Sequence, residues 1–310
     1  MEQVMACTRW TVQWLRKLQN FLQAQWDRSA SSCLLLLSLA MLCVSSLLQP
    51  VFTRLGVDAT EQVIFIQCIS FLLPAGLYFW LERDREAFRF RTVPLTEIPL
   101  VILASVALSI VCLLLSSLLL LLTGGGKGLS SAGILGNSMQ LGLFAGAILP
   151  AFCEEFLLRG AVLRKQESMG RFCILLSGVG FAMLHGSLDN WIGPCLAGCV
   201  YAGLTLRYQS VLPAMVSHFV NNAYLFLMGH LADRYAGMDA ILLLYIINVV
   251  LLFSCIYGII IYYEKHRESI RFFQPLSLPV TDRMEVRRAV TSLPFILFCV
   301  LWVGRVILAL

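Results

Sequence analysis

The chain has 310 residues, of which 59% are hydrophobic and only 13% are charged, whereas globular domains average about 25% charged and 45–50% apolar residues. This composition excludes an ordinary soluble domain. The formal net charge of +5 does not indicate a nucleic-acid partner, because in a membrane protein the placement of charge is more informative than its total.

The first 31 residues are predicted to form an amphipathic helix that lies in the membrane interface. Large apolar residues such as Trp10, Trp14 and Trp26 are interleaved there with basic residues such as Arg16 and Lys17, the pattern of a helix with one face in lipid and one in water. The segment is too polar for a cleavable signal peptide. We therefore treat residues 1–31 as an interfacial segment that precedes the main domain.

From residue 32 onward, apolar runs follow one another along the chain. About 20 residues at 1.5 Å per residue cross a hydrocarbon core of about 30 Å. The sequence therefore predicts an all-α fold, a polytopic membrane helix bundle of about nine spans, eight in the core and one at the C-terminus, forming a single domain over residues 32–310. The expected spans are residues 33–49, 61–81, 98–122, 138–163, 171–187, 191–207, 211–231, 240–263 and 292–310.

Basic residues collect in every second connection between these spans. Cytoplasmic connections of membrane proteins hold the excess of Lys and Arg, so we expect the N-terminus in the cytoplasm and the C-terminus outside, in a bacterial cytoplasmic membrane. The other side has only Arg54, Lys127 and Arg234. The side with the excess carries Arg9, Arg16, Lys17, Arg28, Arg83, Arg85, Arg89, Arg91, Arg164, Lys165, Arg171, Arg207, Lys265, Arg267, Arg271, Arg283, Arg287 and Arg288.

Three of the predicted spans carry polar clusters, and polar groups inside a membrane are costly enough to indicate function. In the span at 138–163, Glu155 and Arg159 are four residues apart and can pair on one helix face, while Glu154 is turned about 100° away. Such a pair could equally be a structural staple. The complete set is Glu154, Glu155 and Arg159, then Phe181 and His185, then His218, Asn221 and Asn222.

The depth of these groups indicates that they meet. At 1.5 Å per residue from the nearest cytoplasmic basic residue, Glu154 and His218 lie roughly 16 Å deep, and His185 and Asn222 lie roughly 21 to 22 Å deep. A lone buried histidine is more often structural. Two histidines and a glutamate at one depth, on helices of alternating direction, favour a shared site, whereas Arg305 near the outer end of the last span is expected to reach the membrane surface.

The motifs Glu154-Glu155-x-x-x-Arg159, Phe181-x-x-x-His185 and His218-x-x-x-Asn222, in this order on hydrophobic helices, resemble those of the CAAX protease and bacteriocin-processing family. Its members include the type II CAAX prenyl endopeptidases. All three motifs are complete within about residues 138–231, which we take as the catalytic core. The resemblance implies an intramembrane endopeptidase whose site opens toward the cytoplasm.

The resemblance also implies a role for each motif residue. Glu154 would be the general base for water, and His185 would hold or polarise that water. Glu155 and Arg159 would orient the site. A glutamate in a low-dielectric cavity suits this role because its charged form is disfavoured there.

His218 and Asn222 would, by the same resemblance, stabilise the oxyanion of the scissile carbonyl, a contribution of about 10² to 10³ in rate per donor in well-studied sites. Two neighbours are expected to support them. Phe181 lies one helical turn before His185 and can place its ring beside it, and Asn221 is expected to hydrogen-bond a neighbouring helix.

Two alternatives remain open at this stage. Glu154, His185 and His218 could instead hold a zinc ion with water as the fourth ligand, although the His-Glu-x-x-His helix of many zinc proteases is absent, so we favour a site without a cofactor. A transporter or channel, or a non-enzymatic immunity scaffold, would also place polar residues in the membrane. The expected partners are membrane lipids and a peptide or lipid-anchored protein substrate.

Overall fold

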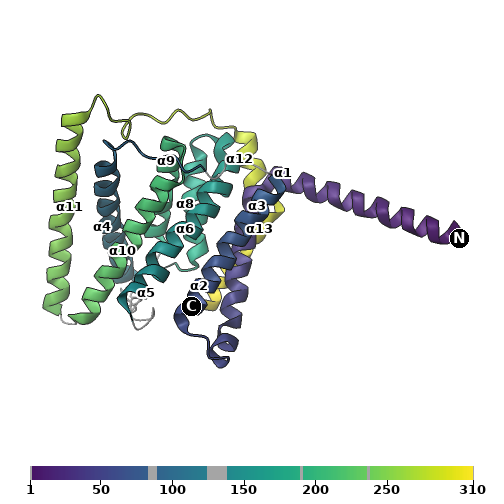
Figure 1. Cartoon of the computed structure of the whole chain (residues 1–310), viewed down its shortest axis with the longest axis horizontal. Helices are drawn as coiled ribbons and strands as arrows, with labels where there is room; N and C mark the ends of the chain where they lie inside the picture. The colour runs from purple at the N-terminus through teal and green to yellow at the C-terminus, as the bar shows by residue number, and fades with distance from the viewer. Residues whose placement is uncertain (1, 83–88, 124–137, 189–190, 236–237, 310) are drawn as a thin grey trace.

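The computed structural model describes residues 2–82, 89–123, 138–188, 191–235 and 238–309; within these ranges it describes side chains at Lys17 and from Ser29 to Leu308, apart from Met238. The described residues are mostly helical and contain no strand. Figure 1 shows the helices standing side by side in one bundle, from which the first part of α1 projects. The predicted all-α class is confirmed.

Thirteen α-helices are described, and several of the membrane-length helices contain a π-helical or 3-10 segment. The π-helical segments are η1 (Cys68–Leu72), η3 (Phe144–Ile148) and η4 (Phe156–Val162), and η5 (Glu167–Met169) is a 3-10 turn. The α-helices are α1 (Glu2–Arg54), α2 (Ala59–Gln67), α3 (Leu73–Glu82), α4 (Ile98–Thr123), α5 (Met139–Leu143), α6 (Leu149–Glu155), α7 (Leu163–Gln166), α8 (Phe172–His185), α9 (Ile192–Tyr208), α10 (Leu212–Arg234), α11 (Met238–His266), α12 (Arg283–Val290) and α13 (Leu293–Ala309).

Five of the described helices are long and apolar enough to cross a membrane, and a pair bent by 51° would make a sixth. The protein is therefore an integral membrane protein, while the count of nine crossings stays a prediction. The three predicted spans that fall short lie in the middle of the bundle: α8 has 14 residues and α9 has 17, and α10, with 23 residues, carries the polar residues His218, Asn221 and Asn222. The five are Ser29–Arg54, Ala59–Glu82, Ile98–Leu122, Met139–Met169 and Asp239–His266, and the bent pair is Arg283–Val290 with Leu293–Leu308.

The N-terminal segment is helical from Glu2, and the helix breaks at Ser29, whose φ of −145° is not helical. Beyond this break α1 enters the bundle, and before it the helix runs away from the bundle (Figure 1). A boundary near residue 31 was predicted from the change in polarity, and the break falls two residues before it. The predicted amphipathic character of residues 1–31 rests almost wholly on side chains outside the described residues and stays a prediction.

The connections that the sequence assigns to one side of the membrane meet at one end of the bundle (Figure 1). The backbone N–H of Val211 donates to the Arg89 carbonyl at 3.0 Å, and that of Arg271 donates to the buried Glu97 carboxylate at 3.1 Å. Tyr208 donates its hydroxyl to the same carboxylate at 2.7 Å. Residues 89–97, 208–211 and 271 therefore share one end, as the alternating charge pattern requires.

Helices α8 and α9 approach each other so closely that their contact needs glycine. A Cβ added to Gly178 would lie 2.3 Å from Cys199 Sγ and 2.6 Å from the Cys195 carbonyl oxygen, and one added to Gly198 would lie 2.9 Å from the Gly178 Cα. Without a hydrophobic force between helices in lipid, such small residues give the close packing that holds spans together. This contact sets α8 and α9 in the centre of the bundle, where the polar motifs lie.

Candidate active site

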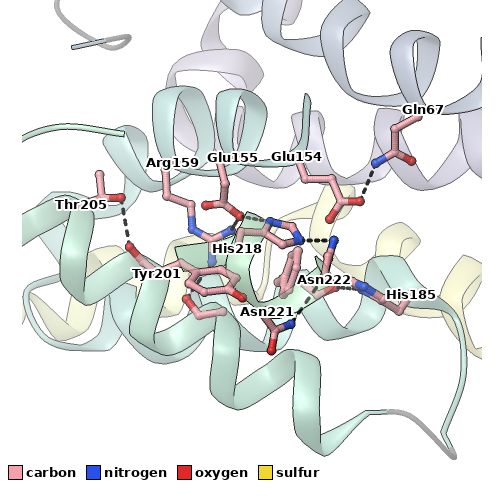
Figure 2. A network of polar contacts seen from close by, with 12 residues as sticks. Gln67, Glu154, Glu155, Arg159, His185, Tyr201, Thr205, His218, Asn221 and Asn222 are labelled. Atoms are coloured by element: carbon pink, nitrogen blue, oxygen red, sulfur yellow. Dashed lines mark hydrogen bonds and ion pairs between the residues drawn. The ribbon is translucent and has the colours of Figure 1, made fainter. Parts of the chain in front are cut away.

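The polar motifs lie on four packed segments in the middle of the bundle. Glu154 and Glu155 end α6, Arg159 lies in the adjoining η4, and His185 is the last residue of α8. His218, Asn221 and Asn222 lie on α10, which packs against α6. Figure 2 shows side chains of all three motifs near one another, so the structure brings the predicted site residues together.

Glu155 is the centre of this network and is completely buried. Its Oε1 accepts from Arg159 Nη1 at 3.0 Å and lies 2.8 Å from Nδ1 of His218. Arg159, 2% exposed, also donates from Nη2 to the Gly198 carbonyl on α9 at 2.7 Å. The ion pair predicted from the spacing therefore forms, and it ties η4, α9 and α10 together.

Two aromatic rings enclose the Arg159 guanidinium and the His218 imidazole. Arg159 Cζ lies 5.1 Å from the centre of the Phe181 ring and 5.4 Å from that of Tyr201. Tyr201 stacks on His218 at 5.1 Å, and Phe181 meets His218 edge-on at 5.4 Å. Phe181 also contacts the His185 ring at 4.8 Å, as its spacing predicted. Tyr201 was not singled out from the sequence, because an aromatic residue in an apolar helix carries no signal of its own.

Glu154 is turned away from the ion pair, as its position on the helix requires. Its Oε1 accepts a hydrogen bond from Gln67 Nε2 at 2.5 Å, and the residue is 8% exposed. Gln67 ends α2 on a different part of the bundle. Sequence reasoning missed this partner, and the only available signal was a polar residue within the predicted span at 61–81. Glu154 is thus a buried carboxylate whose hydrogen-bond donor is neutral.

His218 and Asn222 contact each other on one face of α10. Asn222 Nδ2 lies 3.0 Å from His218 Nε2, so the amide donates to that nitrogen while Nδ1 faces Glu155. Asn221 donates to the Asn222 side-chain oxygen at 3.5 Å, and its own Oδ1 has no hydrogen-bond partner among the described residues. The expectation that Asn221 bonds a neighbouring helix is therefore wrong: its amide finds a nearer acceptor on the next residue of α10.

His185 is the last residue of α8, a helix of 14 residues. Its Nδ1 lies 2.9 Å from the Phe181 carbonyl one turn earlier, so Nδ1 carries the hydrogen in this bond and Nε2 is directed elsewhere. The side chain is exposed, in contrast to the buried Glu155 and His218. The chain then leaves the helix through Gly186, whose φ of 64° is left-handed.

Arg305 on α13 caps the C-terminus of α8, next to His185. Its Nη1 donates to the Leu184 carbonyl at 3.1 Å, and a Cβ added to Gly186 would lie 2.5 Å from Arg305 Nε. The expectation that Arg305 reaches for the membrane surface is wrong. The last carbonyls of a helix have no partner in the helix and carry partial negative charge, and this attracts the guanidinium.

The candidate zinc ligands do not converge. Among the described residues, no three His, Cys, Asp or Glu side chains lie close enough together to hold a metal ion. In particular, the nitrogen of His218 that does not face Glu155 contacts Asn222. Glu154, His185 and His218 therefore do not form a ready three-ligand set, and a zinc ion would fit them only after these side chains had rearranged.

Residues 136–224 match the sequence model of the family described as type II CAAX prenyl endopeptidase Rce1-like. The matched region runs to the first half of α10 and contains every motif residue from Glu154 to Asn222. No curated protein and no solved structure matches the chain. The family resemblance predicted from the three motifs is confirmed, and that family is one of proteases.

Proposed function

Starting from the similarity of residues 136–224 to a family of prenyl endopeptidases, we propose that this protein is an intramembrane endopeptidase. It hydrolyses a peptide bond of a membrane-associated or flexible peptide substrate with a water molecule activated by Glu154. A folded soluble protein cannot enter a site buried in a helix bundle. The substrate must therefore present an extended segment, such as a flexible terminus or a lipid-anchored chain.

The different surroundings of the two adjacent carboxylates carry this proposal. Glu155 forms an ion pair with Arg159 and faces His218, so its negative charge is neutralised by the arginine. Glu154 is hydrogen-bonded by the neutral Gln67 and lies outside that ion pair. A general base must be able to take up a proton during the reaction, and a carboxylate beside a neutral donor does this without breaking a salt bridge. Glu154 is accordingly the base and Glu155 a positioning residue.

Besides a base, peptide hydrolysis needs donors that stabilise the oxyanion of the scissile carbonyl and a group that orients the water, and the remaining residues supply them. Asn222 keeps a second amide hydrogen besides the one directed at His218 and can donate it to the developing oxyanion. His218 holds Asn222 in place, which refines the expectation that both residues donate directly. His185, whose Nδ1 bonds the Phe181 carbonyl, can direct Nε2 toward the attacking water.

The test is to compare peptides released in cells that express wild-type protein, Glu154→Gln or Glu264→Gln, using mass spectrometry of membrane and soluble fractions. Glu154→Gln keeps the size of the side chain and an oxygen that can accept from Gln67 but removes the base, so peptides dependent on the protein should disappear. Glu264→Gln removes an exposed carboxylate at the end of α11 and should leave them unchanged. Zinc content is measured on the same purified proteins.

If Glu154→Gln releases the same peptides as wild type, the assignment of the base is wrong. If about one equivalent of zinc copurifies and is lost in His185→Ala, the metal-free form of the mechanism is wrong while the protease assignment stands.

A further inference from the structure

The connection between α11 and α12 crosses the basic end of the bundle instead of forming a free loop (Figure 1). It comprises residues 267–282, here called the strap, and residues 275–282 of it form neither helix nor strand. Pro275 and Pro279 each fix φ at about −65° and disfavour helix in the residue before them. The proposed chemistry uses no residue of the strap.

Polar contacts tie the first half of the strap to α4 and α9. Ile270 is 2% exposed, and the next backbone N–H, that of Arg271, donates to the carboxylate of Glu97 just before α4 at 3.1 Å. Near the end of α9, Arg207 donates from Nη2 to the Gln274 carbonyl. The strap is therefore fixed to the bundle before its proline-containing half begins.

The second half of the strap places two leucines against an apolar cluster at the helix ends. Leu276 and Leu278 are half-buried. The Leu278 N–H donates to the Leu276 carbonyl at 3.1 Å, a tight turn in which the intervening Ser277 is exposed. The leucines pack on a set of residues from α7, α8 and α9, here called the end cluster, which consists of Leu163, Cys173, Ala202 and Leu206.

The strap also passes the chain before α8 so closely that position 170 needs glycine. Gly170 has a left-handed φ of 61°, and a Cβ added to it would lie 2.5 Å from the Pro279 carbonyl oxygen. Only a residue without a Cβ allows both this φ and this approach. The contacts of the strap thus reach from the start of α4 to the start of α8.

The end cluster lies one helical turn from the candidate site. Leu163 is four residues beyond Arg159, which corresponds to roughly 6 Å along a helix, and Ala202 directly follows Tyr201. The helix that contributes Cys173 to the cluster ends with His185. A peptide that approaches the site along these helices from the basic end therefore meets the strap before it reaches Arg159.

The strap itself shows which ligand the end cluster binds: a flexible peptide with two large apolar side chains two residues apart. Apolar contacts are non-directional, and the bond from Arg207 to the Gln274 carbonyl uses a backbone group that every peptide has. A segment with few buried apolar contacts opens at low cost compared with a packed helix. Another peptide of this kind can therefore compete with the strap.

We propose that the strap is a displaceable cover, and that a flexible segment of the substrate replaces Leu276 and Leu278 on the end cluster before the scissile bond reaches Glu154. The cover keeps peptides that lack such a segment out of the site. Its role in catalysis rests on the proposed protease function, whereas the exchange of the strap for a peptide does not.

The test uses full-length protein in detergent with Glu154→Gln, so that no probe is hydrolysed. The probe is a fluorescent synthetic peptide of residues 272–281, and a second peptide has serine in place of both leucines. Anisotropy reports binding, and hydrogen exchange at residues 271–281 reports opening of the strap. Three straps are compared: the unchanged one, Leu276→Ser/Leu278→Ser, and the control Val280→Ser, which alters a side chain that is 94% exposed.

We expect exchange to accelerate at least about tenfold in Leu276→Ser/Leu278→Ser, because two half-buried leucines contribute about as much as one buried leucine. Val280→Ser should leave exchange unchanged. The leucine-containing peptide should bind Leu276→Ser/Leu278→Ser in a saturable way and bind the unchanged protein at least about tenfold less well, because the tethered strap competes at an effective concentration of about 1 mM. With Glu154 restored, this double variant should release dependent peptides severalfold faster.

If the double variant does not fold, Arg207→Gln removes the donor to the Gln274 carbonyl and gives the same comparison. Unchanged exchange in the variant that folds would show that these contacts do not hold the strap. Equal binding of the peptide to both straps, or of the serine peptide, would place the peptide elsewhere. Faster exchange with unchanged release of dependent peptides would overturn the role as a cover.

Failure of this proposal can be distinguished from failure of the proposed function. If no protein with Glu154 releases any dependent peptide, the protease assignment is wrong. Exchange and anisotropy still decide whether the end cluster binds a peptide in place of the strap, because neither measurement requires hydrolysis.

Discussion

At the scale of single residues, the adjacent carboxylates Glu154 and Glu155 have different partners because one step along a helix turns the side chain in a different direction. The rotation of about 100° per residue directs Glu155 at Arg159 and His218 and directs Glu154 at Gln67. The first contact is a buried ion pair and the second is a hydrogen bond to a neutral amide. We therefore expect substitution of Glu155 mainly to destabilise the protein and substitution of Glu154 mainly to lower its activity.

Glu155→Gln should destabilise the protein far more than Glu154→Gln. Removing one partner of a buried ion pair leaves the Arg159 charge uncompensated, which costs about 3–5 kcal/mol in comparable cases. Glu154→Gln leaves no charged partner behind and should cost less than about 1 kcal/mol, within the range of a neutral hydrogen bond. Unfolding temperatures of the two purified variants measure the difference, and similar unfolding temperatures would contradict the division of roles.

Gln67→Leu should lower turnover while leaving the fold intact. The substitution removes the donor that holds the Glu154 carboxylate, and a hydrogen bond to a charged group contributes about 1.5–3 kcal/mol, or at least about tenfold in rate if the bond acts in the transition state. We expect kcat to fall and KM to change little.

Gln62→Leu is the matched control, because Gln62 lies five residues earlier and donates to the Val57 carbonyl instead of the site. It should alter stability and leave kcat unchanged. A Gln67→Leu protein with full kcat would show that Glu154 needs no positioning from α2.

At the scale of elements, the shortness of α8 decides where His185 stands. The helix ends at His185, and the left-handed Gly186 turns the chain away. The end is closed by Arg305 from α13, more than 100 residues later in the chain. Spacing placed His185 at the right depth, but it gave no indication that the C-terminal helix returns to hold it. We therefore expect the contact between Arg305 and Leu184 to position His185.

Arg305→Leu should increase hydrogen exchange at the end of α8 and lower kcat severalfold, with Arg305→Lys partly restoring both. A cation at a helix C-terminus contributes about 0.3–1 kcal/mol, so the effect should be smaller than that of Gln67→Leu. Arg287→Leu on α12 controls for loss of a surface charge. Unchanged exchange at residues 183–186 in Arg305→Leu would refute the positioning role.

At the scale of the whole molecule, the basic connections gather at one end of the bundle. The charge pattern predicts that this end faces the cytoplasm. The side from which substrate reaches Glu154 follows from that orientation.

Cysteine labelling of a variant without its eleven native cysteines tests the orientation. A cysteine at Ser277, exposed in the connection between α11 and α12, should react with an impermeant maleimide only after cells are opened. A cysteine at Arg54, exposed at the opposite end, should react in intact cells, as should one at Lys127, which lies outside the described residues. The reverse pattern would invert the protein and move substrate access to the other side of the membrane.

The membrane class, the helical content and most residues of the candidate site could be predicted from the sequence. Hydrophobic length and charge alternation act locally, and the i to i+4 spacing of Glu155 with Arg159 and of His218 with Asn222 is fixed by helix geometry alone. Those predictions were confirmed as contacts. The resemblance of the three ordered motifs to a protease family was likewise available from the chain alone.

The distant residues that contact the candidate site could not be predicted, because they depend on how the helices pack. Gln67, Tyr201 and Arg305 reach the site from α2, α9 and α13, and a helix period gives no information about which helices become neighbours. That choice depends on close packing, such as the contact of Gly178 with Gly198, and on where buried polar groups find partners. Both are properties of the assembled bundle, because a span in isolation has no neighbour to select.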